Sequence, residues 1–371
     1  MGNGIIGLTY SPRDVVEIGG TIVFRSSNIR NGEIDYSDLV RVNMNIKENI
    51  ITRKGDLLIC ARNGSPRLIG KNALLTEDEA GQTFGAFMLV YRSSNNPYIH
   101  KLLNTKRYVS QVKENLGARI NQITTANLND FEFYFPTNQE ESKKVADFIG
   151  LLDKRISTQI RVIDKLESLI KGIVVTHFNN VLNKQTITIA NLGESYSVGN
   201  LSKEDLTTTG EPCILYGELF TTYGCVAHNI SSKTKNFEQA TLSQKGDLLF
   251  PASTTVDAVS LISPTTIQTN GVYVAGDMFG IHIARQYNSE YISYLLNYVY
   301  NGKLAKYAQG STIIHLHYND IKTATIQVPT LAEQNKCSLL LELFQKKLTA
   351  ERSLLNMYQV QKNYLLQNMF I

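Results

Sequence analysis

The sequence lacks the features that would place it in a membrane or among exported, disulfide-bonded proteins. No apolar run approaches the roughly 20 residues that a bilayer-spanning helix needs, and Met1–Gly4 carry neither part of a signal peptide. The four cysteines are scattered without a CxxC spacing, which argues against a disulfide framework or structural zinc. His315-x-His317 has no supporting carboxylate or cysteine, so solvent-facing histidines are favoured over metal ligands. We therefore expect a soluble, cytoplasmic chain without a membrane partner or a metal.

Length and charge indicate two domains with different surfaces. A chain of 371 residues, 43% hydrophobic and 19% charged, exceeds one ordinary core. Residues 1–137 carry 16 Lys and Arg against 13 Asp and Glu, and ten of those 16 are arginines. Residues 186–330 carry 8 against 11, with Arg285 as the one arginine. A basic half and an acidic half therefore follow each other along the chain.

An internal repeat organises the chain. The Lys-Gly-Asp-Leu-Leu block at 54–58 recurs 191 residues later at 245–249. Three further blocks recur 193 residues later: Tyr98-Ile99 with the following Leu-Leu-Asn, Gly117-x-x-Ile120, and Pro136-Thr137. Four blocks in the same order at a nearly constant offset indicate a tandem duplication.

Both copies predict the same elements. A Lys-Gly-Asp turn, for which a structural role is favoured, leads into a short strand at 56–60 or 247–250. A second strand follows at 84–91 or 278–284. A helix then runs from about Pro97 to Gly117, or from about Ser289 to Gly310. A last strand is expected at 131–135 or 325–328, ended by a proline.

A long helix with a heptad pattern follows each copy, in 145–177 and again near the C-terminus. Apolar a and d positions over four or more heptads favour a coiled-coil seam. The alternative is an amphipathic helix lying on its own domain, but about 38 residues of helix would extend roughly 57 Å, beyond such a domain. We expect the helices to pair antiparallel and to hold the globular units at opposite ends. The residues assigned to this seam are Ile149, Leu152, Ile156, Ile163, Leu166, Ile170, Leu341, Phe344, Leu348, Leu355, Tyr358 and Leu365.

Two α/β modules, each followed by Pro-Thr and a long heptad helix, resemble the specificity (S) subunit of type I restriction–modification systems. The second copy carries the pattern most clearly, with Val328-Pro329-Thr330-Leu331-Ala332-Glu333-Gln334 opening the helix and Leu365-Leu366-Gln367-Asn368-Met369-Phe370 closing it. The first copy, Phe135-Pro136-Thr137-Asn138-Gln139-Glu140-Glu141, matches less closely. The resemblance covers essentially the whole chain.

The resemblance implies an α+β fold with two tandem target-recognition domains joined by two long antiparallel coiled-coil helices. The expected boundaries are 1–137 for the first domain, 138–179 for the central helix, 180–330 for the second domain and 331–371 for the C-terminal helix. There is one departure from the pattern. At the repeat offset Met1 falls opposite Leu192, so the first copy is expected to lack most of the opening segment found at 188–193.

The resemblance further implies a non-catalytic subunit that reads a bipartite, asymmetric sequence in double-stranded DNA. Its partners would be two methyltransferase subunits, which bind S-adenosylmethionine and methylate adenine. A motor-nuclease subunit, where one exists, would use ATP and Mg. The chain itself is expected to bind no cofactor.

The motifs agree with this division of labour. An adenine methyltransferase uses an Asn/Asp-Pro-Pro-aromatic motif, whereas the nearest match, Asn95-Asn96-Pro97-Tyr98, has one proline. Neither a GxxxxGK[ST] loop nor a nucleophile elbow occurs. Two alternatives stay open: a stand-alone DNA methyltransferase or nuclease, and a coiled-coil scaffold with two protein-binding modules.

Base reading requires hydrogen-bonding side chains on loops that can enter a groove, and arginine on guanine or Asn and Gln on adenine are the common pairs. Polar clusters next to expected strand ends and helix stops meet this requirement, although ordinary solvated loops share their composition. Lys303 and Lys306 are expected to contact phosphates, because the acidic second domain has few other cations near its loops. The first-domain candidates are Arg25, Ser26, Asn28, Arg30, Arg62, Asn63, Ser65, Arg67, Arg119, Asn121 and Gln122, and the second-domain candidates are Tyr216, Glu218, Ser253, Thr254, Thr255, Lys303, Lys306, Ser311 and Thr312.

Overall fold

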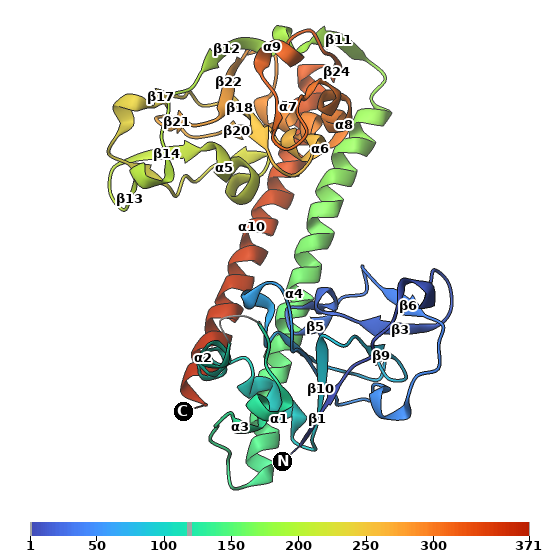
Figure 1. Ribbon diagram of the computed structural model, residues 1–371. Coiled ribbons are helices and arrows are strands. Elements are labelled where there is room, and N and C mark those ends of the chain that lie inside the picture. The colour runs from blue at the N-terminus through green and yellow to red at the C-terminus, as the bar shows by residue number, and fades with distance from the viewer. Residues whose placement is uncertain (1, 117–120, 371) are drawn as a thin grey trace. The chain divides into compact units, whose positions relative to one another are not determined.

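The computed structural model describes residues 2–116 and 121–370 (Figure 1). Two compact units divide the chain: Met1–Ile160 together with Ser353–Ile371, and Arg161–Arg352. Each unit therefore contains one globular part and one portion of each long helix. The expected helix stop at Gly117 and the candidate Arg119 lie outside the described residues.

The two units repeat one sheet plan. In the first unit, one sheet has the order β1-β10-β7-β8 and another the order β2-β6-β3-β9. In the second unit, β12-β22-β18-β20 and β13-β16-β14-β21 have the same orders, with β15 and β17 added at one edge of each. The parallel pairing of Val23 with Thr83 recurs as that of Ile214 with Val274.

Apolar strands explain where the cores lie. Successive residues of β7 pack into two different hydrophobic cores. Leu58 and Cys60 belong to one core, and Leu57 and Ile59 belong to the other. A strand that is buried on both faces has a continuous run of apolar residues, and for this reason β7 and β18 can be predicted from the sequence.

The main strands of the first unit are β1 (Asn3–Ile6), β3 (Thr21–Phe24), β6 (Val40–Val42), β7 (Leu57–Cys60), β8 (Asn72–Leu74), β9 (Thr83–Phe84) and β10 (Met88–Arg92). Those of the second are β11 (Lys184–Thr188), β12 (Gly193–Ser197), β14 (Glu211–Leu215), β16 (Lys233–Thr234), β18 (Leu248–Pro251), β20 (Thr265–Ile267), β21 (Tyr273–Ala275), β22 (Met278–Ile283) and β24 (Thr325–Pro329). The shorter strands are β2 (Val15–Val16), β13 (Leu206–Thr207), β15 (Val226–Ala227) and β17 (Thr241–Leu242).

The aspartate of each Lys-Gly-Asp turn is buried and accepts hydrogen bonds from side chains of other strands. Asp56 receives two hydrogen bonds of 2.9 Å from the guanidinium of Arg92, which also donates to the backbone oxygens of Asn49 and Ile51. Its counterpart Asp247 accepts from the Tyr196 hydroxyl at 2.8 Å and lies 2.7 Å from His282 Nδ1. The turn is thus structural in both units, because a buried carboxylate needs paired donors.

Three expected elements differ in the structure. The expected strand at 84–91 is two strands, β9 and β10. The expected helix from Pro97 is divided into α1 (Asn96–Leu102) and α2 (Lys106–Asn115), because the Thr105 side chain accepts from Tyr108 N and starts a new helix. Its counterpart continues from α7 (Ser289–Leu295) through a π-helical turn into α8 (Asn301–Leu304).

The strand expected at 131–135 is wrong. In the second unit β24 exists as a strand because it pairs along its length with β11, from Lys184 opposite Pro329 to Thr188 opposite Thr325. None of the described segments pairs with 131–135, so these residues form no ladder. This segment follows α3 (Thr125–Asp130) without a ladder.

The long helices α4 (Gln139–Asn180) and α10 (Leu331–Asn368) pack together antiparallel. Within the first unit Arg155 lies over the ring of Tyr358, with 5.2 Å between the guanidinium carbon and the ring centroid. Within the second unit Arg352 bonds Glu167 at 2.6 Å, so residue numbers fall along α10 as they rise along α4. Seam residues such as Ile149, Ile170 and Leu341 are buried.

A cluster of polar groups interrupts this seam around Asp153 in the first unit. Asp153 of α4 bonds Lys101 of α1 at 2.6 Å and Lys362 of α10 at 2.7 Å. Burial opposes ionisation of Asp153, but the two lysines outweigh it and hold the pKa of this carboxyl below its usual range. The carboxylate therefore fixes the register of the helix pair and fastens α1 to it.

We expect Asp153→Asn to lower the melting temperature of the full chain by about 5–10 °C, since it leaves Lys101 buried without a counter-charge at a cost of about 2–3 kcal/mol. Calorimetry at pH 7 measures the shift. Asp164→Asn, an exposed position on the same helix, is the matched control and should change little.

The pH dependence of the stability difference between wild type and Asp153→Asn gives a second test. The pKa of Asp153 is lower in the folded than in the unfolded chain, so its stabilising contribution is full above the unfolded pKa and is lost as pH falls through the folded pKa. The difference between wild type and Asp153→Asn should therefore shrink below about pH 4. A difference that is independent of pH would contradict the assigned role of this carboxylate.

Candidate nucleic-acid interface

Three polar loops of the first unit converge in the structure. Arg62 and Gln122 form an antiparallel bridge, and the Asn121 side chain donates to the Gly64 backbone oxygen at 3.2 Å. Asn63 Nδ2 in turn donates to Ser26 Oγ at 3.0 Å. Candidates from 25–30, 62–67 and 121–122, far apart in the sequence, therefore form one surface.

The second unit builds an equivalent surface with different side chains. Ser253 pairs with His315, the same relation as Arg62 with Gln122 in the repeat. The Ala61 N–H donates to the Phe87 oxygen, and Ala252 donates in the same way to Asp277. Here β19 (Ser253–Thr254) and β23 (Ile314–His315) bring the candidate Ser253–Thr255 cluster next to the exposed Ser311–Thr312 turn.

Comparison with known proteins places this geometry in a family. Residues 177–356 match the family model for the type I restriction modification DNA specificity domain, which spans most of the second unit. This match places residues 177–356 in the type I restriction modification DNA specificity family. The resemblance predicted from the sequence is thereby confirmed.

Solved structures agree with the fold of this specificity chain. The crystal structure of a type I restriction–modification S subunit from M. genitalium has a TM-score of 0.63 and 14% identity, covering 100% of this chain and 94% of that one. A chain from a study of type I system assembly and conformational transition has a TM-score of 0.50 and 13% identity, covering 98% and 96%. At these identities the likeness establishes the fold: mixed α/β domains with two long packed helices. No curated protein sequence matches the chain.

Some of the residues predicted to contact DNA instead form hydrogen bonds and ion pairs within their own loops. Asn28 is fully buried, accepts from Arg25 N and donates to the backbone oxygens of Asp35 and Asp38. Arg25 bonds Asp38 at 2.8 Å, and Arg30 bonds Asp35 at 3.3 Å. As the loop is folded here, Asn28 positions the backbone and does not present its amide to a base.

Arg62 is better placed for base contact. Its side chain is exposed and its guanidinium carbon lies 5.4 Å from the ring centroid of Phe87. Phe87, 59% exposed, was missed by the sequence interpretation, which absorbed it into the strand expected at 84–91. A cleft of about 390 Å³ beside it is lined by Tyr10 and by Arg25–Ser27. An exposed aromatic ring with an arginine stacked on it suits contact with bases.

The remaining first-unit candidates lie around this surface. The Ser65 backbone N–H donates to Asn63 Oδ1, which shapes the turn. Arg67 is exposed and lines a different cleft, bordered by α2 and by the portions of α4 and α10 that belong to this unit. Arg67 therefore borders the helices and is not part of the lining of the cleft beside Phe87.

The second-unit candidates also divide into residues that bond within the unit and residues that are exposed. The Glu218 carboxylate accepts from Leu215 N at 2.8 Å and from the Ser232 hydroxyl at 2.5 Å, so it caps α5 (Tyr216–Glu218). Lys303 donates to the Thr325 oxygen at 2.6 Å and thereby braces β24. Tyr216 and Lys306 are exposed, and Thr254 accepts from Val256 N within its own turn.

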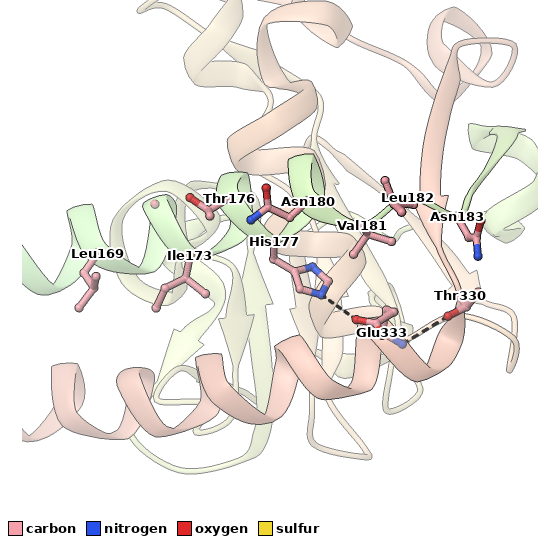
Figure 2. A pocket seen from close by; sticks show the side chains of 11 residues that line it. Leu169, Ile173, Thr176, His177, Asn180, Val181, Leu182, Asn183, Thr330 and Glu333 are labelled. Carbon is pink, nitrogen blue, oxygen red and sulfur yellow. Dashed lines mark hydrogen bonds and ion pairs between the residues drawn. The ribbon is translucent and has the colours of Figure 1, made fainter.

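The helix ends differ between the units. In the second unit, Figure 2 shows His177 of α4 reaching Glu333 of α10, 3.4 Å apart, beside a cleft of about 890 Å³. The other ring nitrogen of His177 lies 3.3 Å from the Tyr291 hydroxyl. The repeat places Phe370 at the equivalent position in the first unit, where its ring packs on Tyr98 with centroids 5.3 Å apart. Each contact joins a helix end to its own globular part, one by polar and one by apolar chemistry.

Within residues 2–116 and 121–370 there is no group of three or more metal-binding side chains. Among the helices of the same residues, none has both the length and the apolar character needed to cross a bilayer.

Proposed function

We propose that this specificity chain reads a bipartite, asymmetric DNA target, with one half-site read by the converged loops of each unit. The observation that carries the proposal is the repeated construction of one loop surface, around Arg62 and Gln122 in one unit and around Ser253 and His315 in the other. Because the side chains on that construction differ between the units, the two half-sites would differ in sequence.

We further infer that the chain binds two methyltransferase subunits, and a motor-nuclease subunit where one exists. Family membership supports this division, since specificity subunits are generally non-catalytic. Each unit also exposes large apolar side chains on its helix portions, for example Leu151 and Met357 in the first and Leu169 and Leu343 in the second. Val174 and Leu366, on the same helices but outside the predicted seam, are buried and do not contribute to this exposed surface.

The chemistry would then belong to those subunits. S-adenosylmethionine would be held by the methyltransferases, and ATP with Mg by the motor-nuclease. Methylation of DNA by the purified chain alone with added S-adenosylmethionine would contradict this assignment and favour the stand-alone enzyme.

The half-site assignment can be tested at Arg62. Arg62→Ala should cost about 1–3 kcal/mol of binding free energy if the guanidinium contacts a base, and the loss should be confined to one half of the methylated motif. Sequencing of methylated sites in cells with the variant and its methyltransferase gives the readout. Arg53→Ala removes the same charge at the other end of β7 and is the matched control. A uniform loss across all sequences would instead identify Arg62 as a phosphate contact.

We also propose that the paired helices set the gap between the half-sites. One heptad inserted after Gln159 and after Glu351 keeps the a/d pattern and adds about 10 Å. The methylated half-sites should stay unchanged while the gap lengthens by about one to three base pairs, or activity should vanish because added pairs rotate the second site away. Sequencing of methylated sites reads the gap directly. Retained activity with an unaltered gap would exclude the helices as a spacer.

A further inference from the structure

Large aliphatic side chains lie exposed on the loop surface of the second unit. Val256 is 74% exposed, Ile313 50% and Val259 47%. Ile313 directly precedes the residue that pairs with Thr254, and Val256 follows Thr254 by two residues, so both lie at the same end of the β19–β23 pair. Single exposed apolar residues are ordinary on a protein surface, whereas apolar side chains gathered in one place mark interaction sites.

Hydrogen bonds fix the turn that carries Val256. Its backbone N–H donates to the Thr254 hydroxyl oxygen at 3.2 Å. On the other side, the Asp257 carboxylate accepts from the backbone N–H of Ser260 at 2.8 Å and from its hydroxyl at 2.7 Å, which caps α6 (Ala258–Leu261). The exposed side chain is thus held by a fixed backbone before any ligand binds, so a contact costs little conformational entropy.

The first unit builds the same turn around a polar residue. There the Ser65 N–H donates to the side chain of Asn63, two residues back, as Val256 donates to Thr254. Ser65 and Val256 each lie nine residues after the aspartate of their Lys-Gly-Asp turn. The two units therefore share the backbone of this turn and differ in what it displays, a hydroxyl in one and an aliphatic side chain in the other.

The charges of the second-unit loops argue against two other uses of this site. Residues 251–262 and 309–317 contain neither Lys nor Arg, and Asp257 is the one carboxylate among them. Phosphates are bound mainly through Lys and Arg, and guanine is read most often by the same cations. These loops instead present aliphatic carbon beside the exposed hydroxyls of Thr255 and Thr312.

Among the base edges of duplex DNA, an aliphatic side chain has a specific partner in thymine. Thymine displays its C5 methyl group in the major groove, where apolar side chains contact it, and the minor groove displays no such group. We propose that the second unit reads thymine through this methyl group, with Val256 and Ile313 in contact with it in the major groove. The inference rests on the proposed function, because it names a base within one of the two half-sites.

The first experiment removes the methyl group alone. The complex of the full chain with its methyltransferase subunits is titrated with duplexes of its own methylated motif, in which each thymine is replaced in turn by uracil. We expect at least one replacement, in the half-site opposite that of Arg62, to weaken binding about threefold to fivefold, the factor for one buried methyl group. Uracil in the unread gap is the control and should leave the affinity unchanged. Equal binding of all these duplexes, or a half-site without thymine in either strand, would overturn the proposal.

The second experiment assigns the methyl contact to the two side chains. The double variant Val256→Ser, Ile313→Ser should bind the thymine duplex about threefold to fivefold more weakly and the uracil duplex as the wild type does. Ile18→Ser removes an exposed aliphatic side chain from the first unit and is the matched control, which should keep the full difference between thymine and uracil. A difference that persists in the double variant, or an equal loss for both duplexes, would overturn the assignment.

Replacement of whole base pairs separates this inference from the proposed function. Exchange of the critical T·A pair for C·G changes every group that the pair displays, and it should weaken binding more than uracil does. If pair exchange weakens binding where uracil has no effect, the half-site is read without the methyl group and only the thymine assignment is wrong. If no pair exchange in that half-site has an effect, the proposed function itself is wrong.

Discussion

The antiparallel register of α4 against α10 is the constraint on which the other features depend. Each compact unit contains a portion of both helices, so neither globular part has its full set of contacts until the two helices have met. The apolar seam supplies the buried contact area between the helices, but apolar side chains alone would also allow α10 to pair with α4 in a register shifted by one heptad. The contacts of Asp153 with Lys101 and Lys362 select one register, because a half-buried carboxylate favours the register that supplies its counter-charges.

The duplication supports the proposal that one fold serves two recognition tasks. The sheet order, the parallel strand pair and the bonding around Ala61 and Ala252 are the same in both units. The two loop surfaces differ in the side chains that this shared frame displays, with Arg62 stacked on Phe87 in one unit and Ser253 opposite His315 in the other. Under the proposed function, sequence change at such positions would alter recognition without disturbing the sheets, since loops carry function on a rigid scaffold.

Much of the fold was predictable because its signals are local or repeated. Strands β7 and β18 are apolar runs behind a turn, and the long helices carry heptads. The strand expected at 131–135 was wrong because a strand requires a pairing partner, which the alternation of apolar and polar residues does not reveal, and none of the described residues pairs with this segment. The site was predicted only as clusters. Asn28 and Glu218 have the residue types of base readers but serve as a loop brace and a helix cap, and only the folded backbone distinguishes these uses.

Phe87 illustrates the opposite error. Its neighbours form a continuous apolar stretch with it, so the sequence assigns it to a buried strand. In the structure the chain between β9 and β10 turns outward and leaves the ring exposed beside Arg62.

The central claim is that the two repeat units contact different halves of one DNA target. Photo-crosslinking from single positions in the assembled complex tests it most directly, with the reactive side chain placed at Phe87 in one preparation and at Thr255 in another. The account predicts that each position cross-links bases on one side of the unread gap, and that the two positions choose opposite sides. Cross-links from both positions to the same half-site would contradict it.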